Sequence, residues 1–337
     1  MPLICYQPKK FDPGTRVVIQ RANEILDEYA AQGYDLTLRQ LFYQFVARGV
    51  IPNKDTEYKR LGSIVNDARL AGEIDWDRIT DRTRNLKENS HWANPQDIVA
   101  ACGDQFQVDK WDTQPNYVEV WVEKDALVGL LEVACRPLDV AYFSCRGYTS
   151  QSEVWVASQR LLAKIRAGKR VTVIHLGDHD PSGIDMTRDI MDRLHNFLSY
   201  HGIRDVAQQN PTRNGEEFED YKERLRPILQ NAWQCAEPVE VHRIALNMDQ
   251  VQQYAPPPNP AKLTDSRARG YIANYGDESW ELDALDPTTI TDLIRLHVGE
   301  LRDDELWKAA IAREQKGRRE LSAVAGGWDD AVRATRP

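Results

Sequence analysis

The N-terminal part of the chain carries apolar residues at the three- and four-residue spacing of amphipathic helices. Three such stretches cover residues 15–32, 38–48 and 56–72, and each ends at a glycine, a common helix stop. Thr37 stands at the expected N-cap of the second helix, and a short β-like stretch with charged turns follows at 73–84. The pattern predicts a winged-helix or helix-turn-helix module, although a generic three-helix bundle fits it as well.

The middle of the chain alternates between strand and helix patterns. Strands are predicted at 117–123, 138–144 and 170–178, and helices at 125–135, 150–167 and 183–199. This order predicts a parallel sheet with right-handed crossovers, which is the α/β, Rossmann-like class. We therefore expect two domains: a helical, winged-helix-like DNA-binding module at 1–110, and the sheet domain with a C-terminal helical extension at 111–337.

Other segments give weaker patterns. A further strand is expected at 240–246 and a terminal helix at 288–317. Residues 210–226 are polar and indicate a loop or a mobile helix. The Pro-rich, basic stretch at 254–271 is either an ordered functional loop or a linker.

Composition narrows the function classes. No apolar run approaches the ~20 residues that span a bilayer, and the first residues lack a secretory signal, so we expect a cytoplasmic protein without membrane contact. Five scattered cysteines without a CxxC pair argue against a zinc site and a disulfide framework. The formal net charge is -9, yet residues 37–87 hold ten Lys and Arg against seven Asp and Glu. This bias is compatible with binding to DNA phosphates, with candidate contacts at Arg48, Lys59, Arg60 and Arg69.

Acidic residues stand at the ends of two predicted strands. Asp178 and Asp180 end the buried strand at 170–178, and Glu123 ends the strand at 117–123. The carboxyl edge of a parallel sheet would bring these carboxylates together, and a hard cation, most naturally Mg²⁺, would relieve their repulsion. The alternative is a turn aspartate followed by a helix-capping one, with Ser182 also able to cap the next helix.

These motifs resemble a known family. VEKDALVGLL at 122–131 and VIHLGDHDPSGIDM at 173–186 resemble the Toprim domain of topoisomerases, primases and related nucleases. The version is most similar to the A subunit of type IIB topoisomerases (topoisomerase VI) and the meiotic double-strand-break transesterase, where the Glu is followed by Lys and soon by Ala, as at 123–126. WELDAL at 280–285 is weakly similar to an acidic-apolar helix near the end of those subunits. The chain departs from the pattern at 145–154, and no ATP-binding transducer domain is present.

The resemblance extends to the N-terminal module. Its members carry a catalytic tyrosine in an R-x-x-x-Y setting, and LRQLFYQF places Arg39 and Tyr43 at that spacing. On a helix both residues fall together on the flank of an apolar stripe. The resemblance implies that Tyr43 attacks a DNA phosphorus, that Arg39 stabilises the phosphate charge, and that Glu123 is a metal ligand or a general acid-base. Asp178 and Asp180 would hold the Mg²⁺.

Several alternatives stay open. Tyr43 could be a boundary or phosphate-contacting residue, the protein could be a Toprim nuclease that activates water, or it could be a non-catalytic DNA-binding or scaffold protein. The resemblance also implies double-stranded DNA as partner, nucleoid association, and a homodimer in which Tyr43 of one subunit meets the metal of the other. A separate regulatory or ATPase subunit is a further partner that the family allows.

Overall fold

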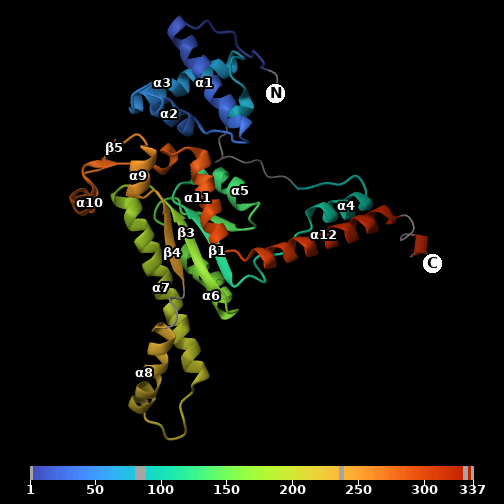
Figure 1. The fold of residues 1–337 in the computed structure, drawn as a ribbon, viewed down its shortest axis with the longest axis vertical. Helices are drawn as coiled ribbons and strands as arrows, with labels where there is room; N and C mark the ends of the chain where they lie inside the picture. Colours follow the sequence, from blue (N-terminus) through green and yellow to red (C-terminus); the bar gives the residue numbers. More distant parts are fainter. Residues whose placement is uncertain (1–2, 80–88, 235–238, 329–332, 335–337) are drawn as a thin grey trace.

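A computed structural model describes residues 3–79, 89–234, 239–328 and 333–334 (Figure 1). A group of N-terminal helices packs on a domain built around a small parallel sheet. Two helical pairs, α7 with α8 and α12 with α4, extend from this domain in different directions (Figure 1). No helix within the described ranges is both long and apolar enough to cross a membrane.

The N-terminal helices form as predicted. They are α1 (Pro13–Ala31), α2 (Leu38–Ala47) and α3 (Asp55–Leu70). Thr37 caps α2 in a capping box, where its hydroxyl accepts the Gln40 N–H at 3.2 Å and the Gln40 side chain accepts the Thr37 N–H at 2.9 Å. The β-like stretch expected at 73–84 holds a 3₁₀ turn at Trp76–Arg78 and one bridge, while residues 80–88 lie outside the described part. Residues 3–79 thus show three α-helices and no β-wing.

A four-stranded parallel sheet confirms the α/β, Rossmann-like class. Its strands β1 (Asn116–Val122), β2 (Ala141–Ser144), β3 (Arg170–Leu176) and β4 (Glu240–Ala245) lie in the order β2-β1-β3-β4. In the register, Val122 lies beside Leu176, so β1 and β3 end at the same level. The residues that follow these two strands are therefore neighbours at one edge of the sheet.

Alternation along the strands gives each face of the sheet its own core. One core contains Val118, Val120 and Val122 of β1, packed with α5 (Val128–Cys135) and α11 (Pro287–Glu300). The other contains Trp121 with α6 (Gln151–Arg166) and α7 (Pro181–Gln209). The sheet is thus covered by helices on both faces, which explains its near-continuous apolar strands.

The first core continues into the N-terminal helices. Buried residues of α1, α2 and α3 belong to the same cluster as α11. Two polar contacts join the same elements: the Tyr34 and Thr291 hydroxyls lie 2.8 Å apart, and the Tyr29 hydroxyl donates to Asp286. These contacts fix the N-terminal helices against the sheet domain.

The later elements differ from the prediction in length and number. Helix α7 runs to Gln209, and the polar segment after it contains α8 (Phe218–Gln234). The single terminal helix expected at 288–317 is two helices, α11 and α12 (Asp304–Gly326), because the Asp303 side chain caps a new start. Helix α4 (Pro95–Gln105) packs on α12, so part of the predicted 1–110 module lies with the C-terminal helix.

The Pro-rich stretch is ordered. It contains β5 (Asn259–Pro260), which pairs antiparallel with β6 (Glu278–Ser279), and it runs from the last residue of α9 (Met248–Tyr254) into α10 (Ala268–Tyr275). The stretch is therefore an ordered part of the domain rather than a linker, and a functional role for it stays a prediction.

Candidate functional site

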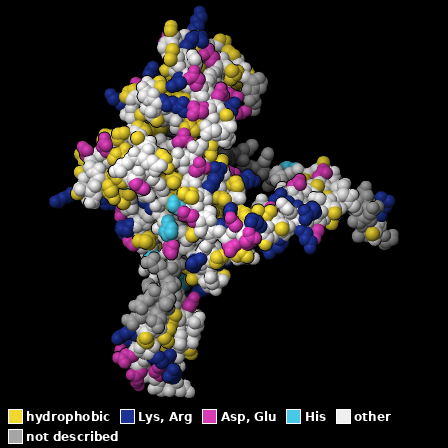
Figure 2. All heavy atoms as spheres, in the orientation of Figure 1, with side chains coloured by type: hydrophobic (Ala, Val, Ile, Leu, Met, Phe, Trp, Pro, Cys, Tyr) yellow, Lys and Arg dark blue, Asp and Glu magenta, His cyan; other side chains and the backbone are white. Residues whose placement is uncertain are grey.

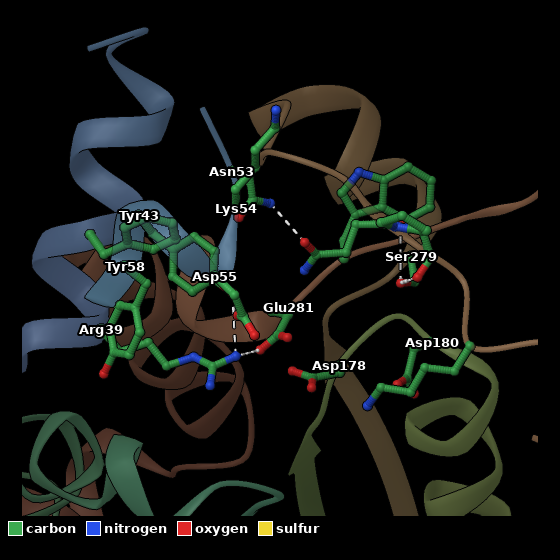
Figure 3. A pocket seen from close by; sticks show the side chains of 15 residues that line it. Arg39, Tyr43, Asn53, Lys54, Asp55, Tyr58, Asp178, Asp180, Ser279 and Glu281 are labelled. Atoms are coloured by element: carbon green, nitrogen blue, oxygen red, sulfur yellow. Dashed lines mark hydrogen bonds and ion pairs between the residues drawn. The ribbon is translucent and has the colours of Figure 1, made fainter. Parts of the chain in front are cut away.

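A pocket of about 250 Å³ lies between the N-terminal helices and the carboxyl ends of the central strands (Figure 3). The Asn53 side-chain NH₂ group donates to Asn259 Oδ1 at 2.7 Å and to the Pro258 carbonyl at 3.1 Å. These bonds tie the N-terminal module to the two-stranded β5–β6 sheet. Three parts of the chain thus meet around it. Its lining consists of Arg39, Phe42, Tyr43, Asn53, Lys54, Asp55, Tyr58, Asp178, Asp180, Asn259, Pro260, Lys262, Ser279, Trp280 and Glu281.

The aspartates of the DHDPSG segment reach this pocket because of a tight turn after β3. Asp180 is the N-cap of α7: its Oδ1 accepts the Gly183 N–H at 2.6 Å and the Ser182 hydroxyl at 2.9 Å. The expectation that Ser182 caps this helix is wrong, because Pro181 already occupies the first helical turn. Gly183 is required here, since a Cβ atom would lie 2.2 Å from the Asp178 carbonyl oxygen.

His179, which lies between the two aspartates in the sequence, fixes the position of this segment. It is buried, its Nδ1 lies 2.7 Å from the Tyr271 hydroxyl, and its backbone pairs with Trp280. Because neighbouring residues of an extended segment point in opposite directions, this anchoring leaves Asp178 and Asp180 facing the pocket. The same backbone pairing brings the WELDAL segment to the end of β3.

Glu123 and Asp178 lie against each other at the ends of β1 and β3, as predicted. Glu123 Oε2 accepts the Asp178 N–H at 2.9 Å. Burial raises the pKa of Glu123, and the charge of Asp180 adds to the shift. Burial likewise raises the pKa of Asp178 to about 7, against the opposing effect of Lys124. The sheet edge thus holds crowded carboxylates for which ionisation is costly.

A compact acid triad consists of Asp178, Glu281 and Asp283. One carboxylate oxygen from each lies within 4.8 Å of the others, which is a spacing that could hold a metal ion. Of the acids predicted as metal ligands, Asp178 belongs to this triad, whereas Glu123 and Asp180 do not. Sequence reasoning noticed WELDAL but assigned no role to Glu281 or Asp283, because only the pairing of Trp280 with His179 reveals their position.

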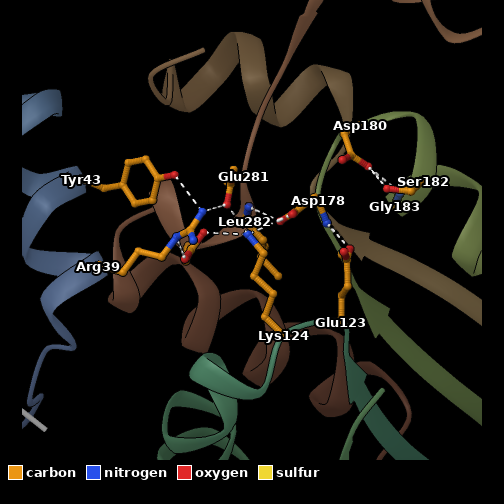
Figure 4. Close-up of polar contacts among 12 residues, drawn as sticks. Arg39, Tyr43, Glu123, Lys124, Asp178, Asp180, Ser182, Gly183, Glu281 and Leu282 are labelled. Atoms are coloured by element: carbon orange, nitrogen blue, oxygen red, sulfur yellow. Dashed lines mark hydrogen bonds and ion pairs between the residues drawn. The ribbon is translucent and has the colours of Figure 1, made fainter. Parts of the chain in front are cut away.

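The chain itself supplies cations to this triad (Figure 4). The Lys124 ammonium lies 2.9 Å from Asp178, 2.5 Å from Glu281 and 2.9 Å from Asp283. Burial alone would lower the pKa of Lys124, but the three carboxylates outweigh it and the pKa is raised. Arg39 pairs with Glu281 as well, and its Nε lies 3.0 Å from Asp283 Oδ2. The triad is therefore closely neutralised by side chains.

Arg39 and Tyr43 lie side by side, as their spacing predicted. The guanidinium donates to the Tyr43 hydroxyl at 3.3 Å, and Figure 4 shows this hydroxyl pointing toward Arg39. Tyr43 is only 4% exposed, so it is more buried than a residue on the flank of the apolar stripe was expected to be. Burial, followed by the charges of Asp283 and Glu281, raises the pKa of Tyr43. These surroundings therefore disfavour the phenolate form of Tyr43.

The predicted set Glu123, Asp178 and Asp180 fits a hard cation in its donor chemistry. Among the described residues, Glu123 Oε1 and Asp180 Oδ2 accept no hydrogen bond, and neither side chain forms an ion pair. The buried Arg243 lies nearby but donates to the carbonyl oxygens of 177, 178 and 183 instead. These carboxylate oxygens are available to a metal ion, which relieves like-charge repulsion.

The four predicted DNA contacts lie away from the pocket lining. Arg48 pairs with Glu28 at 2.9 Å, Arg60 pairs with Glu57 at 2.7 Å, and Lys59 is exposed. Arg69 donates to the carbonyls of residues 76 and 79 and stacks on an indole ring 4.4 Å away. Figure 2 shows basic and acidic side chains interspersed over the N-terminal helices on the face in view. DNA binding by these residues stays a prediction.

Two lysines that the sequence analysis did not select line the pocket. Lys54 precedes α3 and Lys262 follows β5, and both are exposed. No ion pair of either lysine is found in the part of the chain that the structure describes. They bring uncompensated positive charge to the rim of an acidic pocket.

Comparison with known proteins gives no identification. No protein-family model matches the chain, and no curated protein matches it. The function is therefore inferred from the site itself.

Proposed function

We propose that this protein is a Mg²⁺-dependent DNA-cleaving enzyme of the topoisomerase VI A-subunit type, in which Tyr43 becomes linked to a backbone phosphate. One observation carries the proposal: Tyr43 and the strand-end acids Asp178 and Asp180, which are far apart in the sequence, line the same pocket. A nucleophile and a phosphate-binding cation site must meet at one phosphorus, within roughly 3 to 3.5 Å for the attacking atom. The side chains that we assign to these two roles come from one chain and line one pocket.

The proposed step is a transesterification that needs no co-reactant. The Tyr43 hydroxyl oxygen attacks phosphorus and forms a phosphotyrosine ester, while the phosphorus–oxygen bond to one deoxyribose breaks. The phenol proton ends on that deoxyribose oxygen, which leaves as a hydroxyl. A bound Mg²⁺ would neutralise charge on the phosphate oxygens, and Glu123, Asp178 and Asp180 would hold it.

The cationic residues have distinct parts in this proposal. Arg39 touches the Tyr43 hydroxyl at 3.3 Å and so holds the phenol toward the pocket, while it also pairs with Glu281. Lys54, which precedes α3, and Lys262, which follows β5, both line the pocket and would bind phosphates that flank the cleaved one. The positive charge of the rim thereby directs a polyanion to an acidic site.

One observation favours a second candidate, a Toprim nuclease that activates water. Burial and the charges of Asp283 and Glu281 raise the pKa of Tyr43, whereas a nucleophile needs a lowered pKa or a nearby base. In this candidate the same acids and cation act on water, and Tyr43 only shapes the pocket. The two candidates predict different products from the same DNA.

The proposed partners follow from the same chemistry. Double-stranded DNA is the substrate, a homodimer would present two pockets to the two strands, and a regulatory or ATPase subunit would control them. Because one chain already brings Tyr43 and the acids to a single pocket, the geometry does not require the site to be shared between subunits. The proposed location is the cytoplasm, in association with the nucleoid.

A denaturing gel with end-labelled duplex DNA and Mg²⁺ tests the proposal. We expect labelled DNA to migrate with the protein, and Tyr43→Phe to lose this adduct together with cleavage. Tyr58→Phe is the matched control, because Tyr58 lines the same pocket without contacting Arg39 in the described structure. Free cut ends that persist in Tyr43→Phe would establish the nuclease instead, and intact DNA under all conditions would refute both.

A further inference from the structure

Lys124 is a charged side chain that the proposed reaction does not use, although it lies at the centre of the site. It follows Glu123 in the turn after β1, and its side chain is only 20% exposed. Figure 4 shows it extending from that turn to the acids at the end of β3 and in the WELDAL segment. Three carboxylates, one at the end of β3 and two in the WELDAL segment, converge on this one ammonium group.

The surroundings of the ammonium are those of a bound cation. Its contacts of 2.9, 2.5 and 2.9 Å go to one oxygen each of Asp178, Glu281 and Asp283. One oxygen from each of these same three residues lies within 4.8 Å of the others, a spacing that would suit a metal ion. Oxygen ligands from several carboxylates are also what a divalent cation such as Mg²⁺ or Mn²⁺ prefers. Lysine and metal would therefore compete for the same position.

The wild-type triad has little capacity left for a metal. Asp178 uses its second oxygen to accept the Leu282 N–H at 2.8 Å. Glu281 contacts Arg39 as well as Lys124, and Asp283 Oδ2 lies 3.0 Å from Arg39 Nε. A metal ion that entered here would have to displace a buried ammonium from three ion pairs, which is costly.

One oxygen of the triad nevertheless remains poorly satisfied. The Asp283 side chain is 1% exposed, and its Oδ2 accepts no hydrogen bond from any described residue despite the nearby Arg39. A buried carboxylate oxygen that has an ion pair but no hydrogen bond can still take a further cation. Removal of the ammonium would also leave one oxygen each of Asp178, Glu281 and Asp283 without that partner, so the triad would then accept a metal.

We propose that the Lys124 ammonium takes the place of a metal ion among Asp178, Glu281 and Asp283, so that this triad becomes a metal site only when the lysine is removed. The wild-type protein therefore uses one divalent cation, held by Glu123, Asp178 and Asp180. The Lys124 ammonium is the second cation of the site. The location of that single metal rests on the proposed function, whereas the exchange of lysine for metal does not.

Lysine in this position also joins the parts of the pocket. A covalently attached cation holds the β1 turn, the end of β3 and the WELDAL segment together before any metal binds. Asp178 is shared between the two cation positions, so the lysine fixes one of its oxygens. Lys124 is therefore a positioning residue for the metal ligand Asp178.

Counting bound Mn²⁺ by electron paramagnetic resonance in the full chain tests the inference without DNA. We expect one Mn²⁺ per wild-type chain and two per Lys124→Gln chain. The charge-preserving Lys124→Arg should bind one, and the double variant Lys124→Gln/Asp283→Asn should return to one. The Tm of Lys124→Gln should fall in metal-free buffer and recover with Mn²⁺, because ligand binding to the folded state stabilises it.

Each result decides a separate point. An unchanged count in Lys124→Gln, or two ions in the wild type, would overturn the inference. No ion in the wild type with one in Lys124→Gln would refute the proposed catalytic metal and still support the exchange. If Lys124→Gln does not fold without metal, refolding in Mn²⁺ but not in NaCl of equal ionic strength supports the inference, and failure in both contradicts it.

Discussion

The carboxylates at the carboxyl ends of β1 and β3 fall into two halves, which differ in the source of the positive charge that neutralises them. On one side, Glu281 and Asp283 are paired with Lys124 and Arg39 from the chain itself. On the other side, Glu123 and Asp180 form no ion pair with any residue that the structure describes, and each keeps an oxygen free of hydrogen bonds. Asp178 lies between the halves and contacts both.

This difference shows that spacing alone does not locate a metal site. The triad has the tighter cluster of oxygens, yet it already contains an ammonium group. The looser set of Glu123, Asp178 and Asp180 has carboxylates whose charge is unfavourable in isolation, because burial raises the pKa of Glu123 and of Asp178. A metal ion gains more where the carboxylates are not already joined to a side-chain cation in an ion pair.

The largest effect on metal binding is expected from a substitution in the half that has no ion pair. Asp180→Asn should lower Mn²⁺ affinity by about tenfold or more and reduce cleavage at least as strongly, because it removes a metal ligand. Its folding should change little, since Asn caps a helix as well as Asp does. Calorimetric titration with Mn²⁺ and thermal unfolding measure the two quantities.

Glu281→Gln is the matched variant on the other half. It breaks partly exposed ion pairs with Lys124 and Arg39 and should lower the free energy of unfolding by about 1–2 kcal/mol. Its Mn²⁺ affinity should stay within about twofold of the wild type, because the ion binds elsewhere. Equal losses of Mn²⁺ affinity in both variants would show that the two halves act as one site.

A smaller effect concerns the charges that reach DNA. Lys54→Ala and Lys262→Ala should each reduce the slope of log affinity against log salt by about 1, because each removes one phosphate contact. Lys308→Ala on α12 is the control, since its charge is distant from the pocket lining and pairs with Glu305 at 2.7 Å. Fluorescence anisotropy with duplex DNA at several salt concentrations measures the slopes. Identical slopes in all three variants would show that Lys54 and Lys262 do not contact DNA phosphates.

The smallest effect on the site is expected from substitution of His175, which lies in β3 three residues before Asp178. The ring is fully buried with Nδ1 2.8 Å from the Thr187 hydroxyl, and burial lowers the pKa of His175 to about 3. The unfolded chain, with a pKa near 6.5, therefore binds a proton that the folded chain does not, and stability falls as pH drops from about 6.5 to about 3.

Replacing His175 should weaken the pH dependence of the unfolding free energy and leave the affinity for Mn²⁺ unchanged. His175→Asn should show a weaker loss of unfolding free energy between pH 6.5 and 4, by up to about 1.4 kcal/mol per pH unit. Urea unfolding at several pH values provides the comparison, and Mn²⁺ affinity at pH 7 should match the wild type. A parallel pH dependence in both proteins would mean that His175 does not titrate as its burial requires.

Local patterns predicted much of the fold. The capped α2 helix and the strands at 116–122 and 170–176 follow from apolar periodicity and cap residues that lie within a few positions of each other. The extent of α7 was underestimated, because its second half projects from the sheet and carries no clear apolar stripe (Figure 1). The wing of the N-terminal module was expected at residues that fall partly outside the described ranges.

The candidate site was predictable only where it depends on strand ends. Glu123 and Asp178 meet because β1 and β3 are parallel neighbours, which the alternation of strands and helices indicates. Glu281 and Asp283 reach the same edge through a backbone pairing between residues 179 and 280, and no local pattern encodes that long-range contact. The role of Lys124 was missed for the same reason, since its partners come from two other segments, the end of β3 and the WELDAL stretch.

Anomalous X-ray diffraction from crystals soaked in Mn²⁺ tests the central claim most directly. We predict one strong peak bounded by Glu123, Asp178 and Asp180, with the Lys124 ammonium still in contact with Glu281 and Asp283. A peak among Asp178, Glu281 and Asp283, with Lys124 displaced, would contradict the account.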